Sequence, residues 1–192
     1  MKSAFQIGGA IALFLLTFSV HAIPISYRFT GVGSGTLNGT PFNTAQFIIQ
    51  VATTDTTLIT SSKDMFNELI YNTPSSITST IAISGIGSDT ITEGTRLFSN
   101  TSVGAIGLQR SADGDLMNLG GFPNYDLKSA AGPVTGVPGA INQFGNLGTS
   151  HGSLNFSSVP TATFQAFVPE PGALSLLTVT VSLALRRSSR QI

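Results

Sequence analysis

Apolar and polar residues alternate along several short segments of the chain, and this alternation predicts β-strands. In each segment one set of positions is aliphatic or aromatic, and the positions between carry mainly Ser, Thr, Gln or Arg. The apolar positions are Ile25, Tyr27 and Phe29; Ala45, Phe47, Ile49 and Val51; Ile77, Ile81 and Ile83; and Ala162, Phe164 and Ala166. Because successive side chains of a strand point to opposite faces, each segment is expected to bury one face and to expose the other.

Turn-forming residues separate these segments. Leu37-Asn38-Gly39-Thr40 predicts a hairpin turn, and Asp113-Gly114 predicts a second hairpin between strands near 103–109 and 116–119. Gly31, Gly33 and Gly35 precede the first turn without a helical pattern after them. They therefore predict a bulged or closely packed strand and not a phosphate-binding loop.

Two segments break the alternation. Ser62 to Tyr71 predicts a short helix with Phe66, Leu69 and Ile70 on its apolar side. Ser129 to Gly152 contains several Gly and Pro residues and little periodicity, so it is expected to be a long surface loop.

Short antiparallel strands with one wet face each predict an all-β fold, a single antiparallel β-sandwich or jelly-roll-like domain. A parallel sheet would require continuous apolar runs and crossover helices, and the chain has neither pattern. The domain is expected to cover residues 23–167, which is long enough to bury a core. Because the chain has no Cys, its stability must come from the core and from backbone pairing, with a bound ion as an open additional source.

The first 22 residues have the form of a secretory signal peptide. Lys2 is followed by a mostly apolar stretch from Ile7 to Val20, and Ala22 ends a suitable cleavage site. This predicts an N-terminal signal helix that is removed after Ala22; the alternative is an uncleaved anchor helix. His21 would be lost with the signal.

Residues 168–192 form three successive elements. Val168, Pro169, Glu170 and Pro171 are expected to form a rigid exposed linker, because the two prolines do not fit inside a helix. An uncharged run from Ala173 to Leu185 predicts a short hydrophobic helix, below the about 20 residues that span a bilayer. The basic residues Arg186, Arg187 and Arg190 then suit the cytoplasmic side of a membrane. The alternative is a terminal strand or helix of the domain with a solvated basic tail.

Val-Pro-Glu-Pro, an apolar segment and a terminal arginine cluster, in this order, resemble the PEP-CTERM sorting signal. The resemblance covers about the last 25 residues. It implies export by the general secretion machinery, a transient inner-membrane intermediate, and cleavage near the Pro-Glu-Pro by the membrane protease exosortase. It also implies that the mature protein is found at the cell surface or in the extracellular matrix, where it is associated with exopolysaccharide or biofilm.

The charge of residues 23–167 argues against nucleic acid as a partner. This part carries five basic and eight acidic residues, a formal net charge of −3. Nucleic-acid binding requires a basic patch, which this composition lacks.

Candidate chemistry is sparse, and no catalytic, cofactor-binding or metal-binding residue is predicted. His151 is the only histidine after the signal peptide and is expected to be an exposed loop residue, since no Gly-x-Ser-x-Gly motif accompanies Ser150. Asp113 and Asp115 suggest calcium, but Met117 takes the place of the next acidic residue, so turn residues are favoured. Asp89 and Glu93, on either side of Ile91, are expected to be solvent-exposed charges.

The sequence therefore predicts a non-catalytic exported surface or matrix protein. The alternative is a carbohydrate- or small-ligand-binding module tethered at the cell envelope. Tyr27 is expected in the core, which leaves Tyr71 and Tyr125 as aromatic platforms for a sugar ring. A secreted hydrolase is the third hypothesis, and it requires His151 within hydrogen-bond reach of a Ser and a carboxylate.

Overall fold

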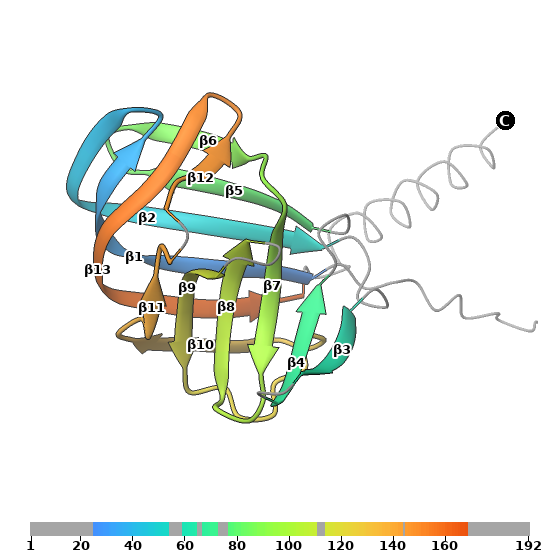
Figure 1. Cartoon of the computed structure of the whole chain (residues 1–192). Coiled ribbons are helices and arrows are strands. Elements are labelled where there is room, and N and C mark those ends of the chain that lie inside the picture. The colour runs from blue at the N-terminus through green and yellow to red at the C-terminus, as the bar shows by residue number, and fades with distance from the viewer. Residues whose placement is uncertain are drawn as a thin grey trace, which may run out of the picture.

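A computed structural model describes residues 25–53, 59–64, 67–72, 77–110, 114–143 and 145–168, and for residues 61–64 and 67–72 it describes the backbone alone. This part of the chain is all-β, and its strands form two antiparallel sheets (Figure 1). It contains no helix with the length and apolar character needed to cross a membrane. The expected signal helix and C-terminal helix lie outside the described residues.

The first sheet has seven strands. In spatial order they are β1 (Ile25–Leu37), β2 (Thr40–Thr53), β5 (Ile77–Ile83), β6 (Gly87–Ile91), β12 (Leu147–Thr149), β13 (Gly152–Phe167) and β10 (Ala131–Gly136). β1 pairs with both β2 and β13, and β12 pairs with both β13 and β6. The pairing of β1 with β13 therefore closes the curled sheet on itself.

The second sheet has six strands and lies across the first (Figure 1). In spatial order they are β11 (Ala140–Ile141), β9 (Gly114–Gly120), β8 (Ala105–Arg110), β7 (Thr95–Asn100), β4 (Asn67–Asn72) and β3 (Ile59–Asp64). Apolar side chains from both sheets form one buried cluster between them.

Alternation correctly predicts which face of the long strands is buried. Ile25, Tyr27 and Phe29 of β1 are fully buried, and so are their register partners on β2 and β13 at Ile49, Val51 and Phe164. The Phe164 ring lies at the centre of this layer, 5.0 Å from the ring centroid of Phe29 and 5.1 Å from that of Phe122. This interlocked aromatic group holds the two ends of the domain sequence together.

The predicted turns are also confirmed. Asn38 and Gly39 both have positive φ angles, 53° and 79°, which suit the tight hairpin turn between β1 and β2. The second predicted hairpin joins β8 to β9, and Gly114 opens β9 with a φ of 136°.

The glycines before the first turn lie in a bent part of β1, as the sequence predicts. The pairing of β1 with β13 shifts register around Ser34 and Gly35, and its pairing with β2 shifts between Gly33 and Gly35. A Cβ at Gly31 would lie 2.6 Å from the Thr161 carbonyl oxygen. The neighbouring strand thus approaches too closely for a side chain, as in a sharply bent sheet.

The helix predicted over Ser62 to Tyr71 is wrong. β3 and β4 form a hairpin there, and β4 continues the sheet by pairing Tyr71 with Phe98 of β7. The backbone hydrogen bonds offered by the edge of β7 outweigh a weak local helix preference, particularly at β-favouring residues such as Ile70 and Tyr71.

The expected loop from Ser129 to Gly152 is also wrong, since it contains β10, β11 and β12. These strands are short, two to six residues; β10 and β11 are edge strands of the two sheets, and β12 pairs with β13 and with β6. Positive-φ turns at Gly132 and Gly145 interrupt them, which explains why no periodicity is visible in the sequence.

Candidate functional site

A polar cluster around Asp89 lies where the β1–β2 turn, β6 and the β12–β13 turn meet, at the upper left of Figure 1. The side chain of Asp89 is only 1 % exposed, so the prediction of a solvent-exposed charge is wrong. The reason lies in the alternation of β6, which places Asp89 on the same inward face as Ile91.

The Asp89 carboxylate accepts hydrogen bonds from three elements. Its Oδ2 accepts from Asn38 Nδ2 at 2.6 Å and from the His151 backbone N–H at 3.2 Å. Its Oδ1 accepts from the Thr90 backbone N–H at 2.8 Å and from the Ser150 hydroxyl. His151 Nδ1 lies 3.1 Å from the same Oδ1. The buried charge is therefore well solvated by protein groups, as a buried carboxylate requires.

These hydrogen bonds hold the pKa of Asp89 far below its ordinary value. The Ser150 hydroxyl has the largest effect; Asn38, His151 and the Thr90 backbone add to it, and burial opposes them. Asn38 is itself fixed, because its Oδ1 accepts from the Thr149 hydroxyl at 2.6 Å. The cluster thus ties together two turns and strand β6, which are far apart in the sequence.

The cluster brings together a Ser, a His and a carboxylate, which is the condition for the hydrolase hypothesis, but not in the geometry of a catalytic triad. A triad places the carboxylate on Nδ1 and the nucleophile on Nε2. Here Ser150 Oγ lies 3.3 Å from the same Nδ1 that faces Asp89, and the Ser150 hydroxyl donates to Asp89. The His151 side chain is 78 % exposed, in agreement with the predicted loop histidine. The arrangement suits a structural role, in which the hydrogen bonds to Asp89 hold the β1–β2 turn and the β12–β13 turn against β6.

Low pH should weaken the hydrogen bonds of the Asp89 cluster, because it protonates the carboxylate. Because the folded-state pKa of Asp89 is lowered, its contribution to stability is complete above the ordinary carboxyl value of about 4 and declines as the pH falls below it. We expect Asp89→Asn to lower the free energy of unfolding at pH 7 and to reduce its decline between about pH 4 and pH 2.5. Urea unfolding followed by circular dichroism at each pH measures both effects.

Asp115 provides the matched control, because its pKa is shifted in the opposite direction. Burial raises the pKa of Asp115, and a 2.6 Å hydrogen bond from Asn118 Nδ2 lowers it by a smaller amount. An aspartate with a raised folded-state pKa loses stability as the pH rises, so Asp115→Asn should stabilise the protein relative to wild type most at neutral pH. Parallel pH profiles for wild type and Asp89→Asn would contradict the role of Asp89.

The other acidic candidates do not form a metal site in the described residues, where no group of three or more His, Asp or Glu side chains is close enough to hold an ion. Asp113 lies outside them, and Asp115 belongs to β9. Glu93 is partly exposed and not a free surface charge, because it forms an ion pair with Arg110 and accepts from the Gly148 backbone N–H at 2.7 Å.

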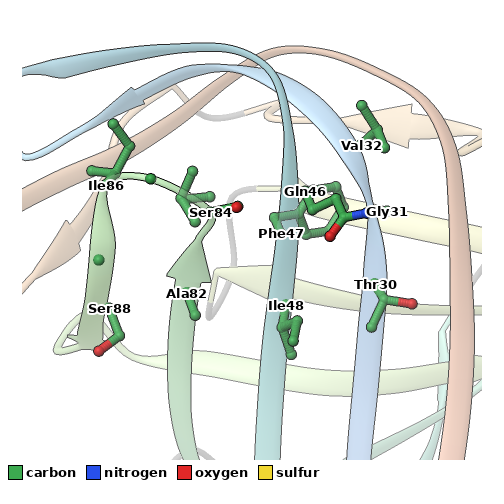
Figure 2. A pocket seen from close by; sticks show the side chains of 13 residues that line it. Thr30, Gly31, Val32, Gln46, Phe47, Ile48, Ala82, Ser84, Ile86 and Ser88 are labelled. Atoms are coloured by element: carbon green, nitrogen blue, oxygen red, sulfur yellow. The ribbon is translucent and has the colours of Figure 1, made fainter.

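The second candidate site is an open groove of about 900 Å³ on the outer face of the seven-stranded sheet. It crosses β1, β2, β5 and β6. One register row supplies Thr30, Ile48, Ala82 and Ser88 from these four strands in turn. Figure 2 shows this row across the sheet, with Val32, Gln46, Ser84 and Ile86 in the next row.

The aromatic platforms expected for sugar binding are not available in the described residues. Tyr125 is 8 % exposed; its ring contacts Phe122 and Phe164, and its hydroxyl donates to the Ser129 carbonyl at 2.7 Å. Burial raises its pKa above the ordinary tyrosine value. Tyr27 is a core residue, as predicted, and its hydroxyl donates to the Leu127 carbonyl at 2.5 Å. The Tyr71 side chain is outside the described set.

The expected processing motif begins at Val168, the last residue that the structure describes. Val168 follows β13 directly and packs against the core. Pro169, Glu170 and Pro171 lie outside the described residues, and so do Ala22, Arg186, Arg187 and Arg190. A comparison of the chain with protein-family models, curated proteins and solved structures found no match.

Proposed function

We propose that this chain is an exported, non-catalytic surface or extracellular-matrix protein, sorted through the motif at residues 168–171. The observation that carries the proposal is the position of this motif relative to the domain. Ser26 pairs with Phe167, so the first strand begins beside the end of the last strand, and the motif follows that strand without a spacer in the sequence. Cleavage near the Pro-Glu-Pro would leave β13 and the aromatic core intact. The signal peptide would be removed beside the same end of the sheet.

In this proposal the uncharged tail segment and Arg186, Arg187 and Arg190 hold an inner-membrane intermediate until exosortase releases the domain. The end of the domain at which β1 begins and β13 ends would then be the end attached to the membrane until cleavage. The Asp89 cluster would lie at the opposite end, beside the β1–β2 turn. The two-sheet arrangement supports grouping the fold with β-sandwich or jelly-roll-like domains.

The sorting motif can be tested by removing its two prolines. We expect a Pro169→Ala, Pro171→Ala variant to remain in the inner-membrane fraction of its host with the C-terminal segment attached, because the rigid extended linker is lost. Cell fractionation with mass spectrometry of the C-terminus measures this. Thr161→Ala, an exposed position on β13, is the control and should mature normally. Normal release of the double variant would contradict the proposal.

The second candidate function is a carbohydrate- or small-ligand-binding module at the cell envelope. The groove across β1, β2, β5 and β6 favours it, since ligand sites are concave and combine apolar surface with a few polar groups. This function would replace the aromatic platforms with an aliphatic surface.

A further inference from the structure

The groove is lined without any charged residue. On the four strands that form it, the described residues include only two charged ones, Arg28 and Asp89. Asp89 is buried on the opposite face, and the Arg28 guanidinium lies over the Phe167 ring, 5.1 Å from its centroid. Arg28 is one register row away from the lining residue Thr30. The residues that line the groove therefore include no group that would neutralise an anionic or a cationic ligand, and Arg28 of the adjacent row is engaged with Phe167.

The polar groups of the groove are available to a ligand. Within the described part of the chain, the side chains of Thr30, Gln46, Ser84 and Ser88 make no hydrogen bond to another protein group. Hydroxyl and amide side chains both donate and accept hydrogen bonds. They therefore match a ligand whose own groups do both, which is the property of sugar hydroxyls.

The floor between these polar groups is aliphatic. Ile48 is 43 % exposed, and Ala82 lies beside it on β5. In Figure 2 the two side chains stand next to each other, with Thr30 and Ser88 at the ends of the row. The row crosses three inter-strand spacings of about 4.8 Å, about 14 Å in all. An extended chain with weakly polar C–H faces fits such a floor.

An extended peptide is a poor occupant of this site. Peptides that bind sheets do so at unpaired edges, through backbone hydrogen bonds. Here the backbones of β1, β2, β5 and β6 already pair with one another along the groove. Only side chains face the ligand, so recognition depends on their hydroxyl, amide and methyl groups.

From these observations we infer that the groove binds a segment of a neutral, hydroxyl-rich glycan and rejects acidic polysaccharides. This inference deepens the second candidate function and rests on it; it does not depend on the sorting proposal. Hydrogen bonds from Thr30, Gln46, Ser84 and Ser88 would orient the sugar hydroxyls over the Ile48–Ala82 floor.

The test uses the full chain in a detergent without a sugar headgroup, so that a failure of sorting in the host does not affect it. The probes are cellohexaose, xylohexaose and maltohexaose, with hexagalacturonate as the acidic counterpart. We expect at least one neutral hexasaccharide to shift the ¹³C-methyl resonances of Ile48 and hexagalacturonate to bind at least about tenfold more weakly. No shift with any neutral probe, or equal binding of the acidic one, would overturn the inference.

Two substitutions on β5 locate the site. Ala82→Arg places a long charged side chain in the groove, and Thr80→Arg places the same side chain on the same face two residues away. We expect Ala82→Arg to weaken binding by about tenfold or more and Thr80→Arg by less than about twofold. Equal losses in both would overturn the assignment, and so would a change of oligomeric state with Ala82→Arg alone, since the groove would then be an interface between copies. The wild-type Ile48 measurement needs neither variant to fold.

Discussion

Replacing Gly35 with alanine is expected to remove a large part of the protein's stability. A Cβ at this position would lie 1.9 Å from the Asn155 carbonyl oxygen and 3.0 Å from the Phe156 Cα, both of which are backbone atoms of β13. Neither can move without separating β1 from β13, the pair that joins the two ends of the domain. We expect a loss of about 3–5 kcal/mol in the free energy of unfolding, which is about 5–15 kcal/mol for a typical domain.

Gly120→Ala is the control for this experiment. Gly120 lies at the end of β9, has no positive φ angle, and would have no atom within 4 Å of an added Cβ. Its substitution should change the free energy of unfolding by less than about 0.5 kcal/mol. Urea unfolding followed by circular dichroism suits both variants, since the chain has no Trp. If the free energy of unfolding of Gly35→Ala lay within about 1 kcal/mol of the wild-type value, the prediction would be wrong. β1 and β13 would then separate more easily than their register indicates.

The second large effect is expected at Phe164. Its ring is fully buried and contacts four other rings, those of Tyr27, Phe29, Phe122 and Tyr125. Phe164→Ala removes these contacts and leaves a cavity between rings that β1, β13 and the 121–130 segment hold in place. We expect a loss of about 3–5 kcal/mol in the free energy of unfolding.

Thr161→Ala serves again as the control, three residues away on the same strand with an exposed side chain. It should differ from wild type by less than about 0.5 kcal/mol in the same urea experiment. Similar losses in the two variants would mean that the aromatic cluster is not the main source of core stability.

Local patterns in the sequence predict those parts of the fold that depend on neighbouring residues alone. Alternation from Ile25 to Phe29 gives the buried face of β1, and Asn38-Gly39 gives its turn, because a strand's faces and a two-residue turn are local properties. The same local view fails at Ser62 to Tyr71, where pairing with the edge of β7 decides the structure. It also fails for β10 to β12, because β11 and β12 have only two and three residues and the positive φ of Gly132 interrupts β10.

The candidate sites show the same division. The burial of Asp89 could have been predicted, since Asp89 and Ile91 lie two residues apart on one strand and therefore share a face, and Ile91 is an apolar residue that faces the core. The partners Asn38 and Ser150 could not, because they come from turns 51 and 61 residues away. The groove also depends on long-range order, because Thr30, Ile48, Ala82 and Ser88 become neighbours only through the register of four strands.

The burial of Tyr125 changes the functional picture most. A tyrosine near a turn signal looks available for stacking in the sequence, but its ring packs against Phe122 and Phe164 and its hydroxyl is taken by the Ser129 carbonyl. Tyr125 is therefore not a platform for a sugar ring, and the proposed recognition by the groove relies on aliphatic and hydroxyl groups, with charge selectivity as its most useful signature.

In the function proposed above, the chain is sorted and cut at its C-terminal motif. The most direct measurement is mass spectrometry of both termini of the protein from its host, with and without exosortase. Sorting through this motif predicts an extracellular form that begins at Ile23 and ends between Val168 and Pro171, present only when exosortase is active. A full-length C-terminus retained in the inner membrane regardless of exosortase would contradict it, and the tail would then be a simple anchor for a domain that faces the periplasm.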